Sequence, residues 1–235
     1  MTETILAELQ SYSKPSIIEG MKRFGINTEY SIGVSIPNIR AIAKRYKNNH
    51  SIALNLWATQ IHEARILATM IDDPKQVSPQ QMEEWVLDFN SWDICDQCCG
   101  NLFDKTPIAF QVAMAWASRK EEYVKRAGFV MMATLAVHHK KAVDTDFYPF
   151  FNLIITASDD ERNFVKKALN WALRQIGKRN SNLHQKALEC CDTLLSFPHK
   201  SALWIAKDAQ RELNNQKIIA RILKKNIPKV NTKDT

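Results

Sequence analysis

Apolar and polar residues recur with a helical period along most of the chain. In residues 16–24, Ile17, Met21 and Phe24 are three or four positions apart, which places them on one face of a helix. Ser78 is the expected N-cap of a later helix, because its hydroxyl can accept a free backbone N–H and a proline follows it directly. Further helices are predicted over 37–46, 78–89, 106–117, 121–137, 146–158, 160–179, 184–195, 201–213 and 216–225, with one bent helix or two short ones over 53–73.

No segment has a convincing period of two residues. Residues 30–37, YSIGVSIP, are expected to form a loop, because a single strand would have no partner. About a dozen helices with short polar links predict an all-α fold: a superhelical stack of antiparallel helix pairs, like a HEAT or armadillo α-solenoid. We expect a single domain over residues 1–225 and a flexible C-terminal tail over 226–235.

Composition is that of a globular protein, with 45% hydrophobic and 24% charged residues and only six glycines. No apolar run reaches the roughly 18–20 residues that span a membrane. The N-terminal segment carries acids where a secretory signal would carry basic residues. The five cysteines are odd in number and clustered, which does not indicate a disulfide framework. We therefore expect a reduced, cytoplasmic protein. A solenoid with polar ends has no evident need of a partner, so a monomer is expected.

Positive charge is concentrated in the second half of the chain. Residues 1–120 contain 12 Lys or Arg and 13 Asp or Glu, whereas residues 121–235 contain 20 and 12. One-sided basic charge favours a polyanionic partner, and nucleic acid is the first candidate. The alternative is a basic surface that binds nothing.

Residues 91–96, SWDICD, place an acid beside a tryptophan at the start of a predicted helix. Ser91 is the expected N-cap, and Asp93 then lies in the first turn, where negative charge is favoured. Trp92 and Asp96 are four residues apart and share one helix face. The alternative is that Trp92 belongs to the core and that Asp96 pairs with a basic helix.

A second candidate surface lies on the helix predicted over 160–179. The opposite face of this helix is apolar and supplies the core. Aromatic rings between cations suit a surface that binds phosphates and stacks on sugars or bases, while a basic helix with an aromatic fringe is the alternative. The residues aligned along this face are Phe164, Lys167, Trp171, Arg174 and Lys178.

A third element is YVKRAGF, in which Lys125 and Arg126 are adjacent and point in different directions. Phe129 and Val130 share the face of Arg126, so this guanidinium is expected at the edge of a groove. There it can hold a carboxylate or a phosphate. A plain surface arginine is the alternative.

These motifs, in this order and spacing, resemble the AlkD-like group of DNA alkylation-repair proteins over residues 5–215. These HEAT-like-repeat DNA glycosylases remove cationic alkylated purines. The family has a tryptophan four residues before an aspartate, an arginine before small and apolar residues, and a tryptophan followed by xLR with an aromatic residue seven positions upstream. The matching residues are Trp92 and Asp96, then Arg126, then Phe164, Trp171 and Arg174.

The resemblance implies a role for each matching residue. Asp96 would stabilise positive charge on the deoxyribose as the glycosidic bond breaks, Trp92 and Trp171 would contact the sugar, and Arg126 would hold a backbone phosphate. Family members act without flipping the base into a pocket. The residues expected to contact DNA are Phe24, Ser35, Lys125, Phe164, Lys167, Arg174 and Lys178.

Two positions depart from the pattern of catalytic relatives. Where these carry a tyrosine facing the lesion and a polar amide in the following loop, this chain has Phe24 and Ser35. The family also includes members that bind DNA, sometimes branched DNA, without removing a base. On the matching motifs, the expected function is excision of 3-methyladenine-type or 7-methylguanine-type bases from double-stranded DNA. A silent binder of distorted or branched DNA and a protein–protein scaffold are the alternatives.

Other chemistry has little support in the sequence. Cys95 and Cys98 form a C-x-x-C, but the next cysteines, Cys190 and Cys191, are far away, so packing is expected and not zinc. No phosphate-binding loop, dinucleotide fingerprint or serine-hydrolase elbow is present. We expect neither a metal nor a cofactor.

Overall fold

The computed structural model describes residues 1–226, which contain fourteen α-helices and no strand. The all-α class is thus confirmed for this part of the chain, and residues 30–37 form a loop, as expected. Of the predicted tail over 226–235, only Asn226 is among the described residues, where it ends the last helix. None of the described helices is both long and apolar enough to cross a membrane.

The chain divides into two compact units, residues 1–112 and 113–235, with the boundary inside α8. Each unit is described by itself, and the single domain expected over 1–225 stays a prediction. The N-terminal unit contains α1 (Thr2–Ser11), α2 (Pro15–Arg23), α3 (Ile36–Ala43), α4 (His50–Ala58), α5 (His62–Ile71), α6 (Pro79–Leu87), α7 (Trp92–Asn101) and the 3₁₀ turn η1 (Phe103–Lys105).

After α8 (Ala109–Ala117), the C-terminal unit continues with long helices. They are α9 (Glu122–His138), η2 (Asp144–Asp146), α10 (Tyr148–Thr156), α11 (Asn163–Gly177), α12 (Ser181–Leu195), α13 (Lys200–Leu213) and α14 (Gln216–Asn226).

Local sequence accounts for several helix boundaries. Ser78 accepts the backbone N–H of Gln81 and caps α6, as predicted. The segment 53–73 forms two helices, because the backbone at Gln60 takes the left-handed conformation (φ 62°) between α4 and α5. Helices α2, α3, α6 and α10 each carry a proline in the first turn, where its fixed φ and missing N–H are tolerated.

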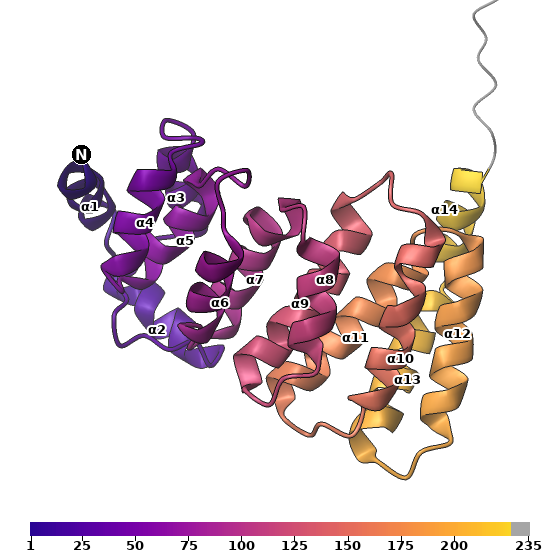
Figure 1. Cartoon of the computed structure of the whole chain (residues 1–235). Coiled ribbons are helices and arrows are strands. Elements are labelled where there is room, and N and C mark those ends of the chain that lie inside the picture. The colour runs from indigo at the N-terminus through magenta and orange to yellow at the C-terminus, as the bar shows by residue number, and fades with distance from the viewer. Residues whose placement is uncertain (227–235) are drawn as a thin grey trace, which may run out of the picture. The chain divides into compact units, whose positions relative to one another are not determined.

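In the N-terminal unit, α5 is the central helix, since it packs against α3, α4 and α7 (Figure 1). Residues 62–69 of α5 are buried without interruption, charged ones included. Arg65 donates to the Asp88 carboxylate at 2.9 Å, and the Trp57 indole donates to the same oxygen at 2.9 Å. A polar side chain buried on α5 therefore has a partner on a neighbouring segment.

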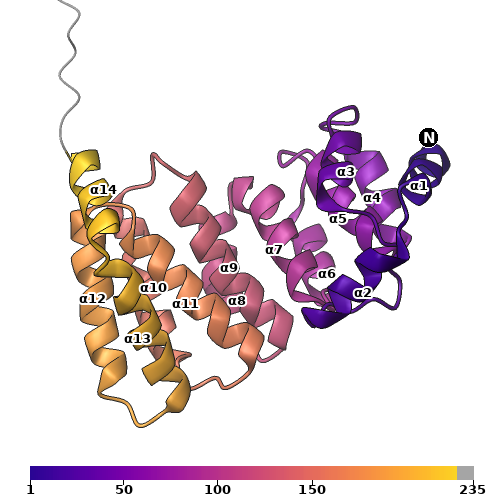
Figure 2. The same ribbon diagram turned by 180° about the vertical axis from the view of Figure 1, so that it is seen from behind.

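In the C-terminal unit, α11 packs most extensively against α9 and also against α12 and α13 (Figure 2). Short turns join consecutive helices such as α12 and α13, which run antiparallel, as predicted for stacked pairs. Gly128 allows α9 to approach α8 closely, because a Cβ there would lie 2.3 Å from the backbone nitrogen of Ala117.

Candidate functional site

The first two turns of α7 present Trp92 and Asp96 together. Both are half-buried, whereas Ile94, Cys95 and Cys98 between and beyond them are buried in the N-terminal unit. The indole N–H of Trp92 donates to the backbone carbonyl of Phe24 at 3.0 Å, which fixes the ring on the accessible side of α7. The carboxylate of Asp96 is therefore held one turn from an oriented aromatic ring.

Phe24 is not placed as its sequence pattern predicts. The expectation that it shares an apolar face with Ile17 and Met21 is wrong: α2 ends at Arg23, and the Phe24 side chain is 72% exposed. The backbone turns at Phe24 (φ −95°, ψ 9°), which takes the ring out of the helical periodicity. An exposed ring beside Trp92 is available to a ligand.

Ser35 lies at the N-cap position of α3 and is half-buried, but its side chain accepts no capping hydrogen bond. The loop before Ser35 is held by the buried carboxylate of Glu63 on α5. This carboxylate accepts the backbone N–H groups of three consecutive residues: Ile32 at 2.9 Å, Gly33 at 2.7 Å and Val34 at 3.2 Å.

Gly33 is required in this loop for two reasons. Its backbone has φ +81°, and a Cβ would lie 2.5 Å from the carbonyl oxygen of Lys14. Glu63 and Gly33 together fix the path of the chain from α2 to α3, and therefore the position of Ser35.

The first turn of α7 is joined to α5 by a hydrogen bond between His62 and Asp93. The Nε2–H of buried His62 donates to Asp93 Oδ2 at 2.8 Å, a tautomer required because an ionised carboxylate only accepts. Ser91 is the N-cap residue of α7 and Asp93 lies in its first turn, as predicted, but the Ser91 side chain makes no capping hydrogen bond. Its hydroxyl instead donates to Asp93 Oδ1 at 2.5 Å.

This arrangement gives Asp93 a pH-dependent contribution to stability. Burial works to raise the pKa of Asp93, but hydrogen bonds from His62 and Ser91 outweigh burial and bring the pKa below its usual 3.8. Because the folded-state pKa lies below that of the unfolded chain, ionised Asp93 stabilises the fold above about pH 4. This contribution is lost as the pH falls through the folded-state pKa.

We therefore expect Asp93→Asn to lower the free energy of unfolding at pH 7 by about 1–3 kcal/mol. The gap to wild type should close as the pH falls below 3.8. Urea unfolding of both proteins at pH 7 and at a series of acidic pH values measures this difference in the free energy of unfolding. Asp159→Asn, at an exposed position, is the control. A gap that does not change with pH would contradict the assignment.

On α11 the predicted surface is partly neutralised. Phe164 and Trp171 are half-buried and Lys167 is exposed, as expected for the edge of a helix face. Arg174 and Lys178, however, both donate to Glu212 on α13, with 2.5 Å from Lys178 Nζ to the carboxylate. Burial would raise the pKa of Glu212, but these two cations bring it below its usual value.

The adjacent cations at the start of α9 also have protein partners. Lys125 pairs with Asp160 at 3.1 Å. Burial would raise the pKa of Asp160, but hydrogen bonds from Arg162 and Lys125 hold the pKa at about 2. Arg126 is buried and donates to the carbonyl of Phe164 at 2.5 Å, which links α9 to α11.

The structure thus groups the predicted residues by unit. Trp92, Asp96, Phe24 and Ser35 belong to the N-terminal unit, and the Trp92–Phe24 hydrogen bond brings two of them together. In the C-terminal unit, Arg126 contacts Phe164. Arg174 and Lys178 are joined by their shared partner Glu212. The members of this second group are Lys125, Arg126, Phe164, Lys167, Trp171, Arg174 and Lys178.

No group of three or more His, Cys, Asp or Glu side chains within the described residues is arranged to hold a metal ion. All five cysteines are buried free thiols, so the expectation that Cys95 and Cys98 serve packing is confirmed.

A sequence model of the DNA alkylation repair enzyme family matches residues 5–231, nearly the whole chain. The chain belongs to the DNA alkylation repair enzyme family. The resemblance seen in the three motifs is confirmed at this level. Among curated proteins, none matches the sequence significantly.

A solved structure described as "a new family of proteins related to the HEAT-like repeat DNA glycosylases with affinity for branched DNA structures" is similar in fold. The two share 22% sequence identity with a TM-score of 0.78, over 94% of this chain and 95% of the other. At this identity the similarity establishes the fold, which is HEAT-like, as the helix pattern predicts.

Proposed function

We propose that this family member is a DNA glycosylase that hydrolyses the N-glycosidic bond of cationic alkylated purines in double-stranded DNA. The observation that carries the proposal is the pairing of Asp96 with an oriented Trp92 on the accessible side of α7. Membership of the DNA alkylation repair enzyme family supports it.

The proposed reaction needs little more than one carboxylate. As the bond from C1′ to the purine nitrogen breaks, its electron pair moves to the base and neutralises the positive charge that alkylation had introduced. The sugar becomes oxocarbenium-like, and Asp96 would stabilise it electrostatically. Water then adds to C1′ and loses a proton to solvent. Because the base leaves as a neutral molecule, no general acid is required.

Aromatic side chains would assist at the same sugar. The face of Trp92 would stabilise the developing cation, and exposed Phe24 would supply a further ring at the lesion. Phe24 lacks the hydroxyl of the tyrosine found in catalytic relatives, so in this proposal it contributes stacking alone.

Lys167, which is exposed on α11, is proposed to contact DNA phosphate. Arg126 is proposed to act indirectly, without touching the DNA. Its buried guanidinium holds the backbone of Phe164, so it would orient the aromatic part of α11. Truncation of Arg126 would disturb packing between α9 and α11, and Lys167 is therefore the better residue for a binding test.

A second candidate function is recognition of distorted or branched DNA without base removal. It is favoured by Phe24, where the family resemblance implies a tyrosine in catalytic relatives, and by the structural similarity to a protein with affinity for branched DNA. This reading and the first share the DNA-binding residues and differ only in catalysis at Asp96.

Base release separates the two candidates. The purified chain is incubated with methylated genomic DNA, and free methylated purines are quantified by chromatography and mass spectrometry. Unmethylated DNA and a reaction without protein serve as controls. Release above both controls supports the glycosylase, whereas salt-sensitive binding of the same DNA without release supports recognition alone.

Replacement of Lys167 by alanine should weaken DNA binding without regard to sequence. Each lost phosphate contact lowers the slope of log K against log salt by about one. Binding is measured by fluorescence anisotropy across a salt series. Lys186→Ala is the matched control, because it removes the same charge from a different helix of the unit, where the ammonium lies over Tyr148. Equal slopes for both variants would exclude Lys167 from the DNA contact.

A further inference from the structure

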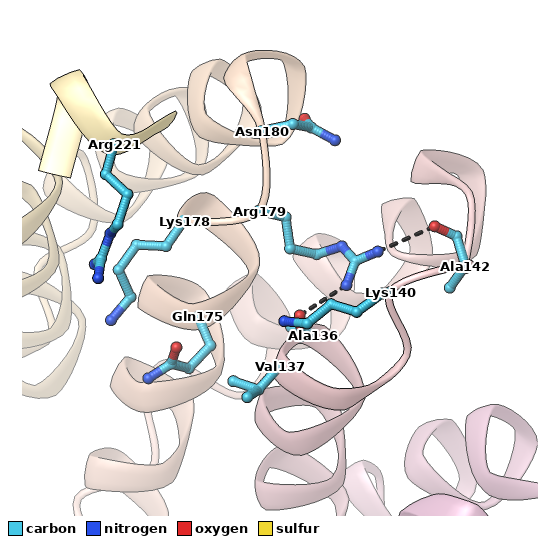
Figure 3. A pocket seen from close by; sticks show the side chains of 9 residues that line it. All are labelled: Ala136, Val137, Lys140, Ala142, Gln175, Lys178, Arg179, Asn180 and Arg221. Carbon is cyan, nitrogen blue, oxygen red and sulfur yellow. Dashed lines mark hydrogen bonds between the residues drawn. The ribbon is translucent and has the colours of Figure 1, made fainter. Parts of the chain in front are cut away.

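A cavity of about 580 Å³ lies within the C-terminal unit, where α9 and α11 end (Figure 3). Its volume is within the range of roughly 300–1,000 Å³ found for sites that hold small molecules. The apolar lining is small, provided by Ala136, Val137 and Ala142. The polar lining consists of Lys140, Lys178, Arg179, Arg221, Gln175 and Asn180.

Four of these side chains are cationic, and none of the lining residues is a carboxylate. In Figure 3 the side chains of Lys178 and Arg221 enter from one side, and Lys140 extends toward them from the opposite side. Charges of one sign are gathered on a concave surface, where they reinforce one another's field. The cavity therefore selects an anion.

Arg179 makes one wall of this cavity rigid. Its guanidinium donates to the carbonyls of Ala136 at 2.7 Å, Ala142 at 3.0 Å and His139 at 3.1 Å, and lies over the ring of Phe147. These contacts fix the guanidinium in place, and its charge is offset only in part by attraction to Asp144 and Asp146. A preorganised cation of this kind costs little to reorganise when an anion binds.

The other three cations differ in how far the protein already neutralises them. Lys178 shares Glu212 with Arg174, so its charge is partly offset. Lys140 and Arg221 are exposed, and within the described residues neither has an ion pair. Two exposed cations facing a fixed one suit the several negatively charged oxygens of a phosphate.

We propose that this cavity is a phosphate-binding site, which takes the phosphate of a small ligand or of the DNA backbone. The proposal stands apart from base excision, since it uses neither Asp96 nor the tryptophans. The Lys140 ammonium and the Arg221 guanidinium are its direct ligands, with Lys178 and Arg179 as supporting charges.

Two pairs of charge reversals test the site in the full chain. Lys140→Glu is matched by Lys141→Glu, because Lys141 is adjacent and exposed but does not line the cavity. Arg221→Glu is matched by Lys217→Glu, an exposed position on the same helix outside the lining. Thermal unfolding is followed with pyrophosphate and with chloride at equal ionic strength, and DNA affinity is followed across a salt series.

If a small phosphate ligand occupies the cavity, pyrophosphate raises Tm of wild type and of both controls by about 3 °C or more. The two cavity variants do not respond. If DNA phosphate occupies it, the cavity variants each lower the salt slope by about one more than their controls. Either result supports the site.

The proposal is overturned if cavity and control variants behave alike in both assays. The cations would then serve only to offset the partial negative charge at the C-terminal ends of α9 and α11. Neither assay measures base release. The phosphate site can therefore fail or hold whether or not the protein proves to be a glycosylase.

Discussion

Asp96→Asn should reduce base release from methylated DNA by roughly 100-fold or more, the scale on which preorganised electrostatic groups act. The amide keeps the size of the carboxylate but removes its negative charge, so the oxocarbenium-like sugar loses its stabilisation. DNA affinity should be unchanged or slightly higher, because a negative charge near phosphates has been removed. Single-turnover release rates and anisotropy measured on the same variant give the two quantities.

Glu84→Gln is the control for this variant, since it neutralises an exposed carboxylate of the same unit on a different helix, α6. It should release base at the wild-type rate. Activity of Asp96→Asn close to that of wild type would remove Asp96 from the mechanism, even if wild type proves to be a glycosylase.

The largest loss of stability is expected for Glu63→Ala, at about 3–5 kcal/mol. The substitution leaves two buried backbone N–H groups and one partly buried one without their acceptor. Each orphaned donor costs about 1–3 kcal/mol, with partial relief from exposure to water and relaxation of the loop. Such a loss is a large fraction of the 5–15 kcal/mol typical of folded proteins. Urea unfolding followed by circular dichroism measures it.

Glu63→Gln separates charge from shape, because the amide oxygen can still accept while its NH₂ group faces donors. Its loss should lie between wild type and Glu63→Ala. Glu19→Ala, at an exposed position on α2, should change stability by no more than about 0.5 kcal/mol. A loss for Glu63→Ala as small as this control would mean that the loop before α3 does not depend on the carboxylate.

Helical periodicity and capping chemistry predicted most of the fold. Periods of three and four residues identified the helices from α2 onward, and Ser78 with its following proline marked the start of α6. Helix α1 was not among the predicted elements. The all-α class followed because these signals are local, carried by neighbours within one or two turns.

The interactions that connect helices could not be predicted in the same way. His62 and Asp93 are 31 residues apart, and Glu212 lies 34 residues from Lys178, so neither pairing leaves a trace in local spacing. For this reason the cationic face of α11 is less positive in the structure than its sequence suggests. Phe24 departs from its pattern because the helix ends one residue before it.

Trp92 and Asp96 were predictable as a pair because they lie one turn apart on a single helix. What the sequence did not provide is how they are held. The orientation of Trp92 comes from a carbonyl 68 positions away in the chain, and the first turn of α7 is anchored by a histidine on α5. Order along the chain identified the candidate site, and tertiary contacts positioned it.

The buried thiols of α7 determine how this helix responds to reactive electrophiles. Cys98 and Cys99 are fully enclosed, and burial raises the pKa of both thiols well above the usual value. The thiolate is the form that electrophiles attack, and here it is both unformed and unreachable. These two thiols of α7 are therefore protected from electrophiles such as methylating agents, although other side chains of the same helix are accessible.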